Sequence, residues 1–438
     1  MAATIQYELK PGGRLTGCLQ VPGDKSLSHR SIMLGSLADG EVLIEGFLEG
    51  ADALATLAAF RAMGVQIEGP REGRVRIQGV GIDGLKPPTH PLDLGNSGTS
   101  MRLLAGLLSG QSFDCVLTGD DSLSQRPMQR VIEPLRRMGA RIKASARGTA
   151  PLLIQGNNSL TGIHYELPVA SAQVKSCVLL AGLYARGTTC VTEPAATRDH
   201  TERLLQGFAY PVDVSGPRVC VQGGGRLKAS AIQIPADISS AAFFLVGAAI
   251  AAGSDLTLTN VGINPTRTGV IHLLQAMGAQ IEINNTRVIG GEPIADLTVR
   301  AARLQGIDIP EALVPLAIDE FPALFIAAAC AEGTTRLTGA SELRVKESDR
   351  IHVMADGLNT LGIEATPTPD GIVIQGGQIQ GGQVESHKDH RIAMAFAMAA
   401  LRARSTIRVL DCENVNTSFP GFVTLAKQAG LNIVESGT

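Results

Sequence analysis

Residues 21–30, VPGDKSLSHR, combine a turn, a helix start and two cations. The Pro-Gly pair favours a turn, and the side chain of Asp24 or Ser26 can cap the helix that follows. Ser26 and Arg30 are four residues apart and share one helix face, while Lys25 lies beside the free N–H groups of the first turn. Helix N-termini carry positive partial charge and favour anions. The segment therefore indicates either an anion site or a capped helix with solvated charges, and it lacks the Walker pattern of a nucleotide loop.

Similar polar signals recur along the chain, and each comes just before an apolar, Ala-rich stretch. The signals are Asp24-Lys25-Ser26, Asn96-Ser97-Gly98-Thr99, Ser171-Ala172-Gln173, Asp237-Ile238-Ser239-Ser240, Asp319-Glu320 and Asp389-His390-Arg391. Their spacing of roughly 70 residues indicates a sixfold internal repeat. One signal alone is an ordinary helix cap, as expected for Asp319, although Gly98 would let a ligand approach the backbone closely. Several helix starts that point to one place would hold anions.

Arginines recur in the polar loop that precedes the second helix of a repeat. Arg126 stands before a Pro-Met pair, Arg198 opens the sequence RDHTE, and residues 344–350 read RVKESDR. A cluster of alternating charge usually marks a solvated helix start, but three copies of one loop beside the inner helix starts favour a binding role. At the sixth helix start, His390 and Arg391 oppose the helix dipole, and a local rule broken in this way indicates a functional site.

Each repeat is predicted to run helix, strand, helix, strand. The first helices are expected to end near Gly40, Gly110, Gly187, Gly253, Gly333 and Ser405, and the second helices at Gly64, Gly139, Gly207, Gly278, Gly362 and Gly430. Glycine suits the left-handed position that ends a helix. The first helix is apolar nearly all round, as in residues 241–250 (AAFFLVGAAI), and is therefore predicted to be a buried inner helix.

The repeats predict an α/β (α+β) fold of two domains. One unit cannot bury both its sheet and its helix faces, so three units would pack into one domain and six into two. The predicted domains are residues 22–240 and residues 1–21 plus 241–438. The N-terminal strand would then belong with the second domain.

The composition bounds the class of protein. The chain has 438 residues, 50 of them glycine, with no tryptophan, four tyrosines and eleven phenylalanines, which suggests close backbone packing rather than large aromatic cores. The net charge of −3 argues against a nucleic-acid or anionic-membrane partner. Seven cysteines with no C-x-x-C pair predict reduced, structural thiols rather than a disulfide framework. The N-terminus has no signal-peptide pattern, and the longest apolar stretch, residues 241–252, is too short to span a bilayer. These features predict a cytoplasmic protein.

The sequence gives no support for three other kinds of site. Residues 79–84 fit G-x-G-x-x-G, but the sequence KPP at residues 86–88 prevents a helix from opening there, which excludes a dinucleotide site. The eight histidines show no H-E-x-x-H pattern and no ligand spacing with cysteine, so no zinc or other metal site is predicted. The absence of G-x-S-x-G argues against a hydrolase elbow.

Taken together, the motifs resemble those of the 5-enolpyruvylshikimate-3-phosphate (EPSP) synthase family. They are Pro22-Gly23-Asp24-Lys25-Ser26 with His29-Arg30, Gly95-Asn96-Ser97-Gly98-Thr99, Gln125-Arg126-Pro127-Met128, Arg344-Val345-Lys346-Glu347-Ser348-Asp349-Arg350 and Asp389-His390-Arg391. The resemblance covers essentially the whole chain. It implies a two-domain, inside-out α/β barrel-like fold in which each domain has three repeated βαβαββ-type units, with an active site in the cleft between the domains.

The resemblance also implies an activity and its substrates. The family is a carboxyvinyl transferase of aromatic amino-acid biosynthesis: it transfers the enolpyruvyl group of phosphoenolpyruvate to the 5-hydroxyl of shikimate 3-phosphate and releases phosphate, without metal or organic cofactor. A monomer is implied. Phosphoenolpyruvate would contact Lys25, Asn96, Gly98, Arg126, Gln173, Arg350 and Arg391. Shikimate 3-phosphate would contact Lys25, Ser26, Arg30, Ser171, Ala172, Gln173, Arg198, Asp319 and Lys346. Both substrates carry phosphate and carboxylate groups, which arginine guanidinium groups bind bidentately.

The chemistry needs two proton movements, because the vinyl methylene must gain a proton and the attacking hydroxyl must lose one. Asp319, Glu347 and Lys25 are the catalytic candidates. We expect Asp319 to take the hydroxyl proton and Glu347 to serve at the methylene carbon. The methylene proton could instead come from another of the three.

Two departures from the family pattern resemble its second, glyphosate-tolerant branch. Ala172 stands where many members carry serine. Many members also carry lysine just before Thr-Phe-Pro, whereas here Thr417 precedes Ser418-Phe419-Pro420. Gly98, by contrast, lacks the extra methyl group that tolerant members often have, so the response to glyphosate stays open.

Two other functions are possible on the same scaffold. The sister enolpyruvyl transferase that acts on UDP-N-acetylglucosamine usually has a catalytic cysteine in the loop that holds Arg126, and residues 119–128 contain none. A non-catalytic anion-binding protein on the same scaffold would gain nothing from the two carboxylates of Asp319 and Glu347.

Overall fold

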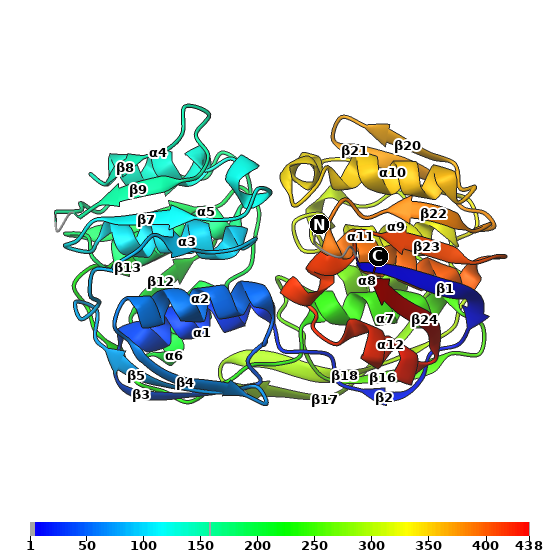
Figure 1. Ribbon diagram of the computed structural model, residues 1–438, viewed down its shortest axis with the longest axis horizontal. Coiled ribbons are helices and arrows are strands. Elements are labelled where there is room, and N and C mark those ends of the chain that lie inside the picture. The colour runs from blue at the N-terminus through cyan, green and yellow to red at the C-terminus, as the bar shows by residue number, and fades with distance from the viewer. Residues whose placement is uncertain (1–4, 157–158, 438) are drawn as a thin grey trace. The chain divides into compact units, whose positions relative to one another are not determined.

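The computed structural model describes residues 5–156 and 159–437. Residues 1–4, which contribute to the expected absence of a signal peptide, lie outside this part. The chain divides into two compact units: the first unit is Gly23–Ile234, and the second unit is Met1–Pro22 with Pro235–Thr438. Both helices and strands are abundant in each unit (Figure 1), which confirms the predicted α/β class.

The described part of the first unit has six α-helices, and its inner helices α1, α3 and α5 begin where the polar signals predict. The six helices are α1 (Lys25–Leu37), α2 (Ala51–Ala62), α3 (Gly98–Ser109), α4 (Gln129–Arg137), α5 (Ala172–Gly182) and α6 (His200–Gly207). The inner helices α1, α3 and α5 are buried along almost their whole length. Side chains of Asp24, Ser97 and Ser171 accept hydrogen bonds from backbone N–H groups of the first turn, which explains why these helices start there.

Three sheets surround the helices of the first unit. Their strands are β3 (Ala38–Glu45), β4 (Gln66–Arg71), β5 (Arg74–Val80), β6 (Leu92–Asp93), β7 (Cys115–Thr118), β8 (Arg141–Lys143), β9 (Leu152–Gln155), β10 (His164–Glu166), β11 (Thr188–Thr192), β12 (Val212–Ser215), β13 (Arg218–Gln222), β14 (Leu227–Lys228) and β15 (Ile232–Gln233). The strand orders are β14-β3-β5-β4 with β15 also on β3, β6-β7-β9-β8, and β10-β11-β13-β12. In each sheet a parallel pairing is followed by two antiparallel ones, so one topology is repeated three times.

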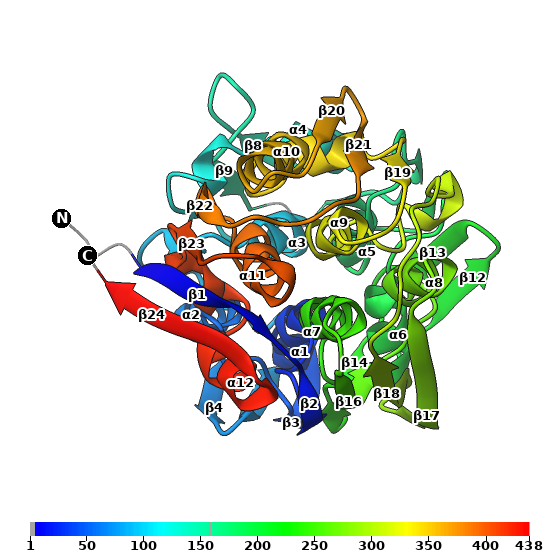
Figure 2. The same cartoon turned by 90° about the vertical axis from the view of Figure 1, so that its right-hand side faces the viewer.

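The second unit repeats this plan. Its helices are α7 (Ile238–Ile250), α8 (Gly269–Ala276), α9 (Phe321–Ala329), α10 (Arg350–Thr360), α11 (His390–Ala399) and α12 (Phe422–Ala429). Its strands are β1 (Ile5–Gly13), β2 (Thr16–Leu19), β16 (Asp255–Gly262), β17 (Gln280–Ile289), β18 (Glu292–Arg300), β19 (Thr334–Leu337), β20 (Ala365–Thr368), β21 (Gly371–Gln375), β22 (Gly382–Glu385), β23 (Ile407–Leu410) and β24 (Leu431–Gly437). Figure 2 shows the inner helices α7, α9 and α11 nearly end-on within a surround of strands.

The N-terminal strands complete sheets of the second unit. β1 pairs antiparallel with β23 and β24, so that Tyr7 lies opposite both Val409 and Glu435. β2 pairs in parallel with β16. Strands near the start of the chain thereby complete two sheets whose other strands come from Asp255 onwards.

Glycines contribute to the fold in two different ways. Gly430 has φ 115° and ends α12 in the left-handed conformation, as predicted. A left-handed glycine does not end the inner helices, where the prediction was wrong. Helices α1, α5, α7 and α9 end several residues before Gly40, Gly187, Gly253 and Gly333, and Gly40, with φ 107°, lies within β3. Gly110 does end α3, but with φ −91° it is right-handed. In the inner helices, close packing is the important role of glycine: a Cβ atom on Gly106 would lie 2.1 Å from the carbonyl oxygen of Cys177, so α3 and α5 meet backbone to backbone.

This contact yields a stability prediction. Gly106→Ala should destabilise the protein by about 1–3 kcal/mol, because the added methyl group meets backbone that cannot move away. Gly207→Ala is the matched control: it is an exposed helical glycine with nothing within 4 Å of an added Cβ, and it should be stabilising by about 0.4–1 kcal/mol. Denaturant unfolding of the two variants measures both effects. Equal stabilities would show that the contact is not tight.

Aromatic residues cluster despite their low number. Phe244, Phe419 and Phe422 lie with ring centroids 5.4–6.2 Å apart, and Tyr7 adds a fourth ring 6.2 Å from Phe422. The second unit therefore has a small aromatic core, which the composition did not suggest.

Two cysteines depart from the expected reduced state. Cys190 and Cys220 form a disulfide between directly opposite positions of β11 and β13. The count of cysteines could not reveal this pairing, because it depends on strand register. The expectation of structural thiols fits the buried Cys115, whose pKa burial raises to about 12.

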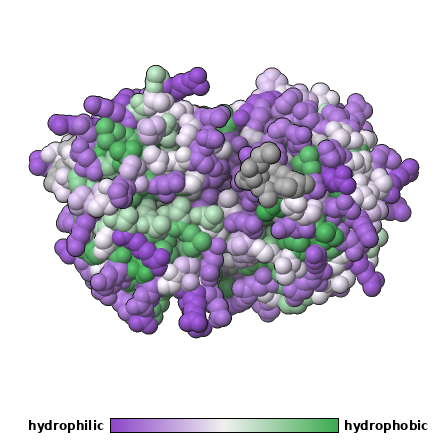
Figure 3. Space-filling view, in the orientation of Figure 1, coloured by the Kyte–Doolittle hydropathy of each residue, from purple (hydrophilic) through white to green (hydrophobic). Residues whose placement is uncertain are grey.

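Seven large apolar side chains are exposed among the described residues. They are Leu43, Val169, Val214, Ile283, Val288, Val345 and Val434. On the face shown in Figure 3, hydrophilic residues predominate and the hydrophobic ones form separate small patches. Among the residues that the structure describes, none of the helices has both the length and the apolar character that crossing a bilayer demands.

Candidate functional site

The start of α1 brings together the cations that the first motif predicted. The Nζ atom of Lys25 lies 3.1 Å from the carboxylate of Asp52, which α2 supplies. The guanidinium of Arg30 is 3% exposed and donates to the hydroxyls of Thr201, at 2.7 Å, and Ser176, at 2.8 Å. It also donates to the backbone oxygen of Ser26 at 3.0 Å, so Arg30 ties the start of α1 to α5 and α6.

The start of α3 meets the loop that carries Arg126. One guanidinium nitrogen of Arg126 donates to Oδ1 of Asn96 at 2.6 Å, and the other donates to its backbone oxygen at 3.1 Å. A Cβ atom on Gly98 would lie 3.1 Å from the Arg126 guanidinium. Glycine at this position therefore leaves room for the cation beside the helix start.

The start of α5 is connected to α3 by an arginine that the sequence analysis missed. Ser171 caps the helix, Ala172 is its first residue, and Oε1 of Gln173 accepts from Arg102 at 2.5 Å. The amide of Gln173 donates to Thr99 at 3.0 Å. Arg102 stands one turn after the predicted Gly98, and that i+4 spacing could have revealed it.

A buried charge cluster anchors the segment between β11 and α6, which carries Arg198. Lys175 is 1% exposed and lies 3.1 Å from the carboxylate of Glu193 and 2.7 Å from that of Glu202. The hydroxyl of Thr197 also donates to Glu193. Burial raises the pKa of Glu193, although Lys175 and Thr197 act in the opposite direction.

The raised pKa of Glu193 predicts how stability depends on pH. A carboxyl group whose pKa is higher in the folded state stabilises the fold below its unfolded-state pKa, and that contribution is lost as pH rises through the folded-state pKa. Glu193→Gln cannot ionise and keeps the Lys175–Glu202 pair. The free energy of unfolding of this variant, relative to wild type, should therefore increase from about pH 4 towards neutrality. Exposed Glu364→Gln is the control, and a flat difference for both variants would contradict the expectation.

In the second unit Arg350, the first residue of α10, lies at the centre of an ionic cluster. Its guanidinium is 2.8 Å from Asp389, 2.5 Å from Glu347 and 3.4 Å from Asp319. Burial alone would lower the pKa of Arg350, but the three carboxylates raise it and keep the cation charged. Lys346 lies 3.2 Å from the same Asp319 oxygen, so this carboxylate lies between two cations.

At the start of α11, an acidic cap offsets the two basic residues that oppose the helix dipole. Asp389 is fully buried, accepts from the backbone N–H of Arg391 at 2.9 Å and so caps the helix. The side chain of Arg391 donates to the backbone oxygen of Asp319 at 3.0 Å. Asp319 itself was expected to cap α9, and that expectation is wrong: Glu320 holds the N-cap position and makes no capping bond, while Pro322 occupies the first turn.

Arg267 is a second arginine that the sequence analysis missed. It is 3% exposed and donates to Ser239 at 2.6 Å, with Asp237 at 3.2 Å and Glu320 at 3.8 Å. It lies in the loop before the outer helix α8, as Arg126 lies in the loop before α4. Alignment of the repeats could therefore have found it.

Each unit thus gathers its own share of the predicted residues near inner-helix starts and in the loops before outer helices. The first unit holds Lys25, Ser26, Arg30, Asn96, Gly98, Arg126, Ser171, Ala172, Gln173 and Arg198, and the second holds Asp319, Lys346, Glu347, Arg350 and Arg391. Cations and helix N-termini predominate in the first set, which suits phosphate and carboxylate groups. The second set adds two carboxylates that could move protons.

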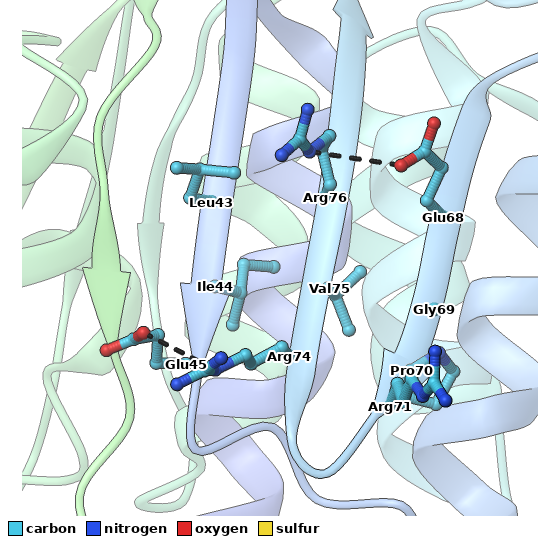
Figure 4. A pocket seen from close by; sticks show the side chains of 10 residues that line it. All are labelled: Leu43, Ile44, Glu45, Glu68, Gly69, Pro70, Arg71, Arg74, Val75 and Arg76. Carbon is cyan, nitrogen blue, oxygen red and sulfur yellow. Dashed lines mark ion pairs between the residues drawn. The ribbon is translucent and has the colours of Figure 1, made fainter.

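Two pockets of the first unit contain none of these residues. A pocket of about 720 Å³ lies on β3, β4 and β5, where Arg74 pairs with Glu45 and Arg76 with Glu68 across the strands (Figure 4). A second, of about 480 Å³, is lined by Gln111 and other residues beyond the inner helices' C-terminal ends. Neither pocket adds to the candidate site.

The fold as a whole is found in a solved structure of low sequence identity. The crystal structure of the enolpyruvyl transferase NikO from Streptomyces tendae matches over 100% of both chains with a TM-score of 0.80, and at 17% identity it shows the fold alone.

The family is shown by closer matches. A family model described as EPSP synthase (3-phosphoshikimate 1-carboxyvinyltransferase) matches residues 9–425. Proteins named 3-phosphoshikimate 1-carboxyvinyltransferase from Alkalilimnicola ehrlichii and Methylococcus capsulatus are each 69% identical over 98% of this chain, covering 96% and 98% of the relatives. EPSP synthase from Acinetobacter baumannii matches with a TM-score of 0.88 at 59% identity, over 99% of this chain and 100% of that one. The chain belongs to the EPSP synthase family, and it is an enzyme, a carboxyvinyl transferase.

Proposed function

We propose that the chain transfers the enolpyruvyl group of phosphoenolpyruvate to the 5-hydroxyl of shikimate 3-phosphate and releases inorganic phosphate. This is a step of the shikimate pathway towards chorismate and the aromatic amino acids. The observation that carries the proposal is the carboxylate of Asp319, held 3.2 Å from Lys346 and 3.4 Å from Arg350, in a chain of this family. A carboxylate placed beside two cations suits a base that works on an anionic substrate.

The reaction needs each proton to be moved at a stated atom. As the hydroxyl oxygen bonds to the central carbon of phosphoenolpyruvate, Asp319 accepts the hydroxyl proton and Glu347 supplies a proton to the methylene carbon. The carbon–oxygen bond to phosphate then breaks, and the Glu347 carboxylate takes a proton back from the new methyl group, which restores the vinyl group. The proton held by Asp319 passes to the departing phosphate. Lys25, Arg126, Arg350 and Arg391 stabilise the negative charge of the donor throughout. Asn96, Gly98 and Gln173 complete the contacts proposed for it.

The acceptor is proposed to lie against hydroxyls, backbone and cations. Its contacts are Lys25, Ser26, Arg30, Ser171, Ala172, Gln173, Arg198, Asp319 and Lys346. Because Arg30 already donates to Thr201 and Ser176, we propose that it reaches the acceptor with a fixed orientation rather than as a mobile cation. No cofactor or metal enters this proposal.

Product analysis tests the proposed function. Mass spectrometry of a reaction with phosphoenolpyruvate should show one carboxyvinyl group added to shikimate 3-phosphate and none added to UDP-N-acetylglucosamine. Addition to the nucleotide sugar would favour the sister transferase, and binding of both anions without any product would favour the non-catalytic alternative.

The glyphosate-tolerant branch is a finer hypothesis, which Ala172 and Thr417 support. Thr417 supplies a hydroxyl, donated to the backbone oxygen of Asn414 at 2.7 Å, where many family members supply a lysine. Inhibition by glyphosate in competition with phosphoenolpyruvate, compared between wild type and Thr417→Lys, tests the assignment. Equal, strong inhibition of both would count against it.

A monomeric state, a cytoplasmic location and the absence of nucleic-acid or membrane partners stay hypotheses as well. Light scattering tests the monomeric state.

Gly98→Ala should raise the KM for phosphoenolpyruvate several-fold. The added methyl group would lie 3.1 Å from the guanidinium of Arg126 and 3.2 Å from that of Arg102, so both flexible side chains must shift by a few tenths of an ångström. The KM for shikimate 3-phosphate should change less. Steady-state kinetics with each substrate varied in turn measures both constants, and an unchanged KM for phosphoenolpyruvate would place the donor elsewhere.

A further inference from the structure

His29 lies in a buried network of hydroxyl groups that the proposed reaction does not use. Its ring is fully buried in α1. Nδ1 is 2.7 Å from the hydroxyl of Thr56 in α2, and this hydroxyl is 2.6 Å from that of Ser100 in α3. The hydroxyl of Ser100 is 2.7 Å from that of Ser97, which lies 3.5 Å from Nε2 of the same histidine. The four side chains therefore form a closed ring.

The direction of every hydrogen bond in the ring follows from one of them. Ser100 donates its only hydroxyl proton to Ser97, so the bond between Thr56 and Ser100 must be donated by Thr56. Thr56 then has no proton left for His29, and Nδ1 must carry the proton that bonds to Thr56. The hydroxyl of Ser100 also lies 3.3 Å from Nδ1, and because its proton goes to Ser97, it can only accept there. Nε2 is left as an acceptor, which faces the hydroxyl of Ser97. Each group donates once and accepts once around the ring.

The ring stays neutral in its surroundings. Burial, together with the smaller effects of the Lys25 and Arg30 charges, lowers the pKa of His29 to about 3, while Asp24 acts in the opposite direction. A neutral imidazole has one donor and one acceptor, which is what the ring requires.

The ring also lies next to the candidate site. His29 follows Lys25 by one turn of α1, and Thr56 follows Asp52 by one turn of α2, so the Lys25–Asp52 pair and the His29–Thr56 bond are successive links between the same two helices. The ring also includes Ser97, whose hydroxyl caps α3 by accepting from the backbone N–H of Ser100 at 3.1 Å. Asn96 and Gly98 flank that cap.

We propose that His29 is a positioning residue: as the Nδ1–H tautomer it closes a ring of four hydrogen bonds that fixes the start of α1, with Lys25, against the start of α3, with Asn96 and Gly98. The consequence for phosphoenolpyruvate rests on the proposed function, whereas the ring itself does not. The ring sets the distance between the lysine and the loop that together receive the donor.

Nitrogen-15 NMR of the histidine ring tests the tautomer without reference to activity. In protein labelled at histidine, the signals that vanish in His29→Asn belong to His29. We expect Nδ1 to show a bonded proton and Nε2 to behave as an unprotonated nitrogen, unchanged from pH 8 to pH 5. A proton on Nε2, or ionisation in this range, would overturn the proposal.

Kinetics of Thr56 variants tests the positioning role. Thr56→Val keeps the shape and removes the hydroxyl, and it should raise the KM for phosphoenolpyruvate about tenfold, because a small misplacement of binding groups is costly. The KM for shikimate 3-phosphate should rise less, and Thr56→Ser should restore both. An unchanged KM for phosphoenolpyruvate in a folded Thr56→Val variant, or equal rises in both constants, would overturn the role.

A matched control separates the ring from burial in general. Thr189 of β11 is fully buried, and its hydroxyl has no hydrogen-bond partner among the described residues. Thr189→Val should leave both KM values unchanged; a rise equal to that of Thr56→Val would overturn the role. If the wild-type enzyme showed no transfer to shikimate 3-phosphate, the proposed function would fail, and the NMR result would still decide whether the ring exists.

Discussion

Lys25→Met is expected to lower kcat/KM by about 100- to 1000-fold, the loss typical of one preorganised charge removed from a reaction centre. Methionine keeps most of the length and apolar stem of lysine but cannot stabilise the phosphate or carboxylate of the donor. The Lys25 side chain is only 16% exposed, so water replaces its charge poorly. Steady-state phosphate release measures the effect.

Two controls separate lost chemistry from lost stability in this variant. Removal of Lys25 removes its ion pair with the buried carboxylate of Asp52, which destabilises the fold. The double variant Lys25→Met/Asp52→Asn should recover stability but not activity, and Lys143→Met, on an exposed strand position of the same unit, should leave both unchanged. Recovery of activity in the double variant would show that Lys25 acts only through the fold.

Asp319→Asn should lower kcat about 100- to 10,000-fold, the range for a positioned proton acceptor, with a much smaller change in the KM for shikimate 3-phosphate. The amide keeps the size of the carboxylate but cannot take the hydroxyl proton. Arg350 retains Glu347 and Asp389 as partners, so the cluster should stay folded.

The exposed Asp308, which pairs with Arg336 at 3.2 Å, provides the matched control. Asp308→Asn removes one carboxylate from the same unit and should leave kcat unchanged. A kcat near the wild-type value in Asp319→Asn would remove this residue from the proposed proton transfer, and a parallel loss in both variants would point to net charge rather than to position.

The sequence alone predicts the helix starts well, because capping is a local interaction. Asp24, Ser97, Ser171, Asp237 and Asp389 each accept from a backbone N–H within three residues. The fifth inner helix is the exception, since Glu320 at its N-cap bonds instead to the hydroxyl of Ser239, far away in the chain.

Partners of the charged residues could not be predicted, because they depend on tertiary packing. Nothing near Lys25 in the sequence points to Asp52, and nothing near Arg350 points to Asp389; each pair joins two helices. The disulfide of Cys190 and Cys220 likewise depends on the register of β11 and β13.

The residues that the sequence analysis missed share one cause. Arg102 and Arg267 lie outside the motifs that carry the resemblance, although Arg267 lies in the loop before α8 that corresponds to the Arg126 loop before α4.

A phosphate-release assay with both substrates, run against each substrate alone, tests the central claim most directly. We predict that phosphate appears only when phosphoenolpyruvate and shikimate 3-phosphate are present together, and that Asp319→Asn suppresses it. Phosphate released at the same rate from phosphoenolpyruvate alone, or no release with both substrates, would contradict carboxyvinyl transfer to shikimate 3-phosphate.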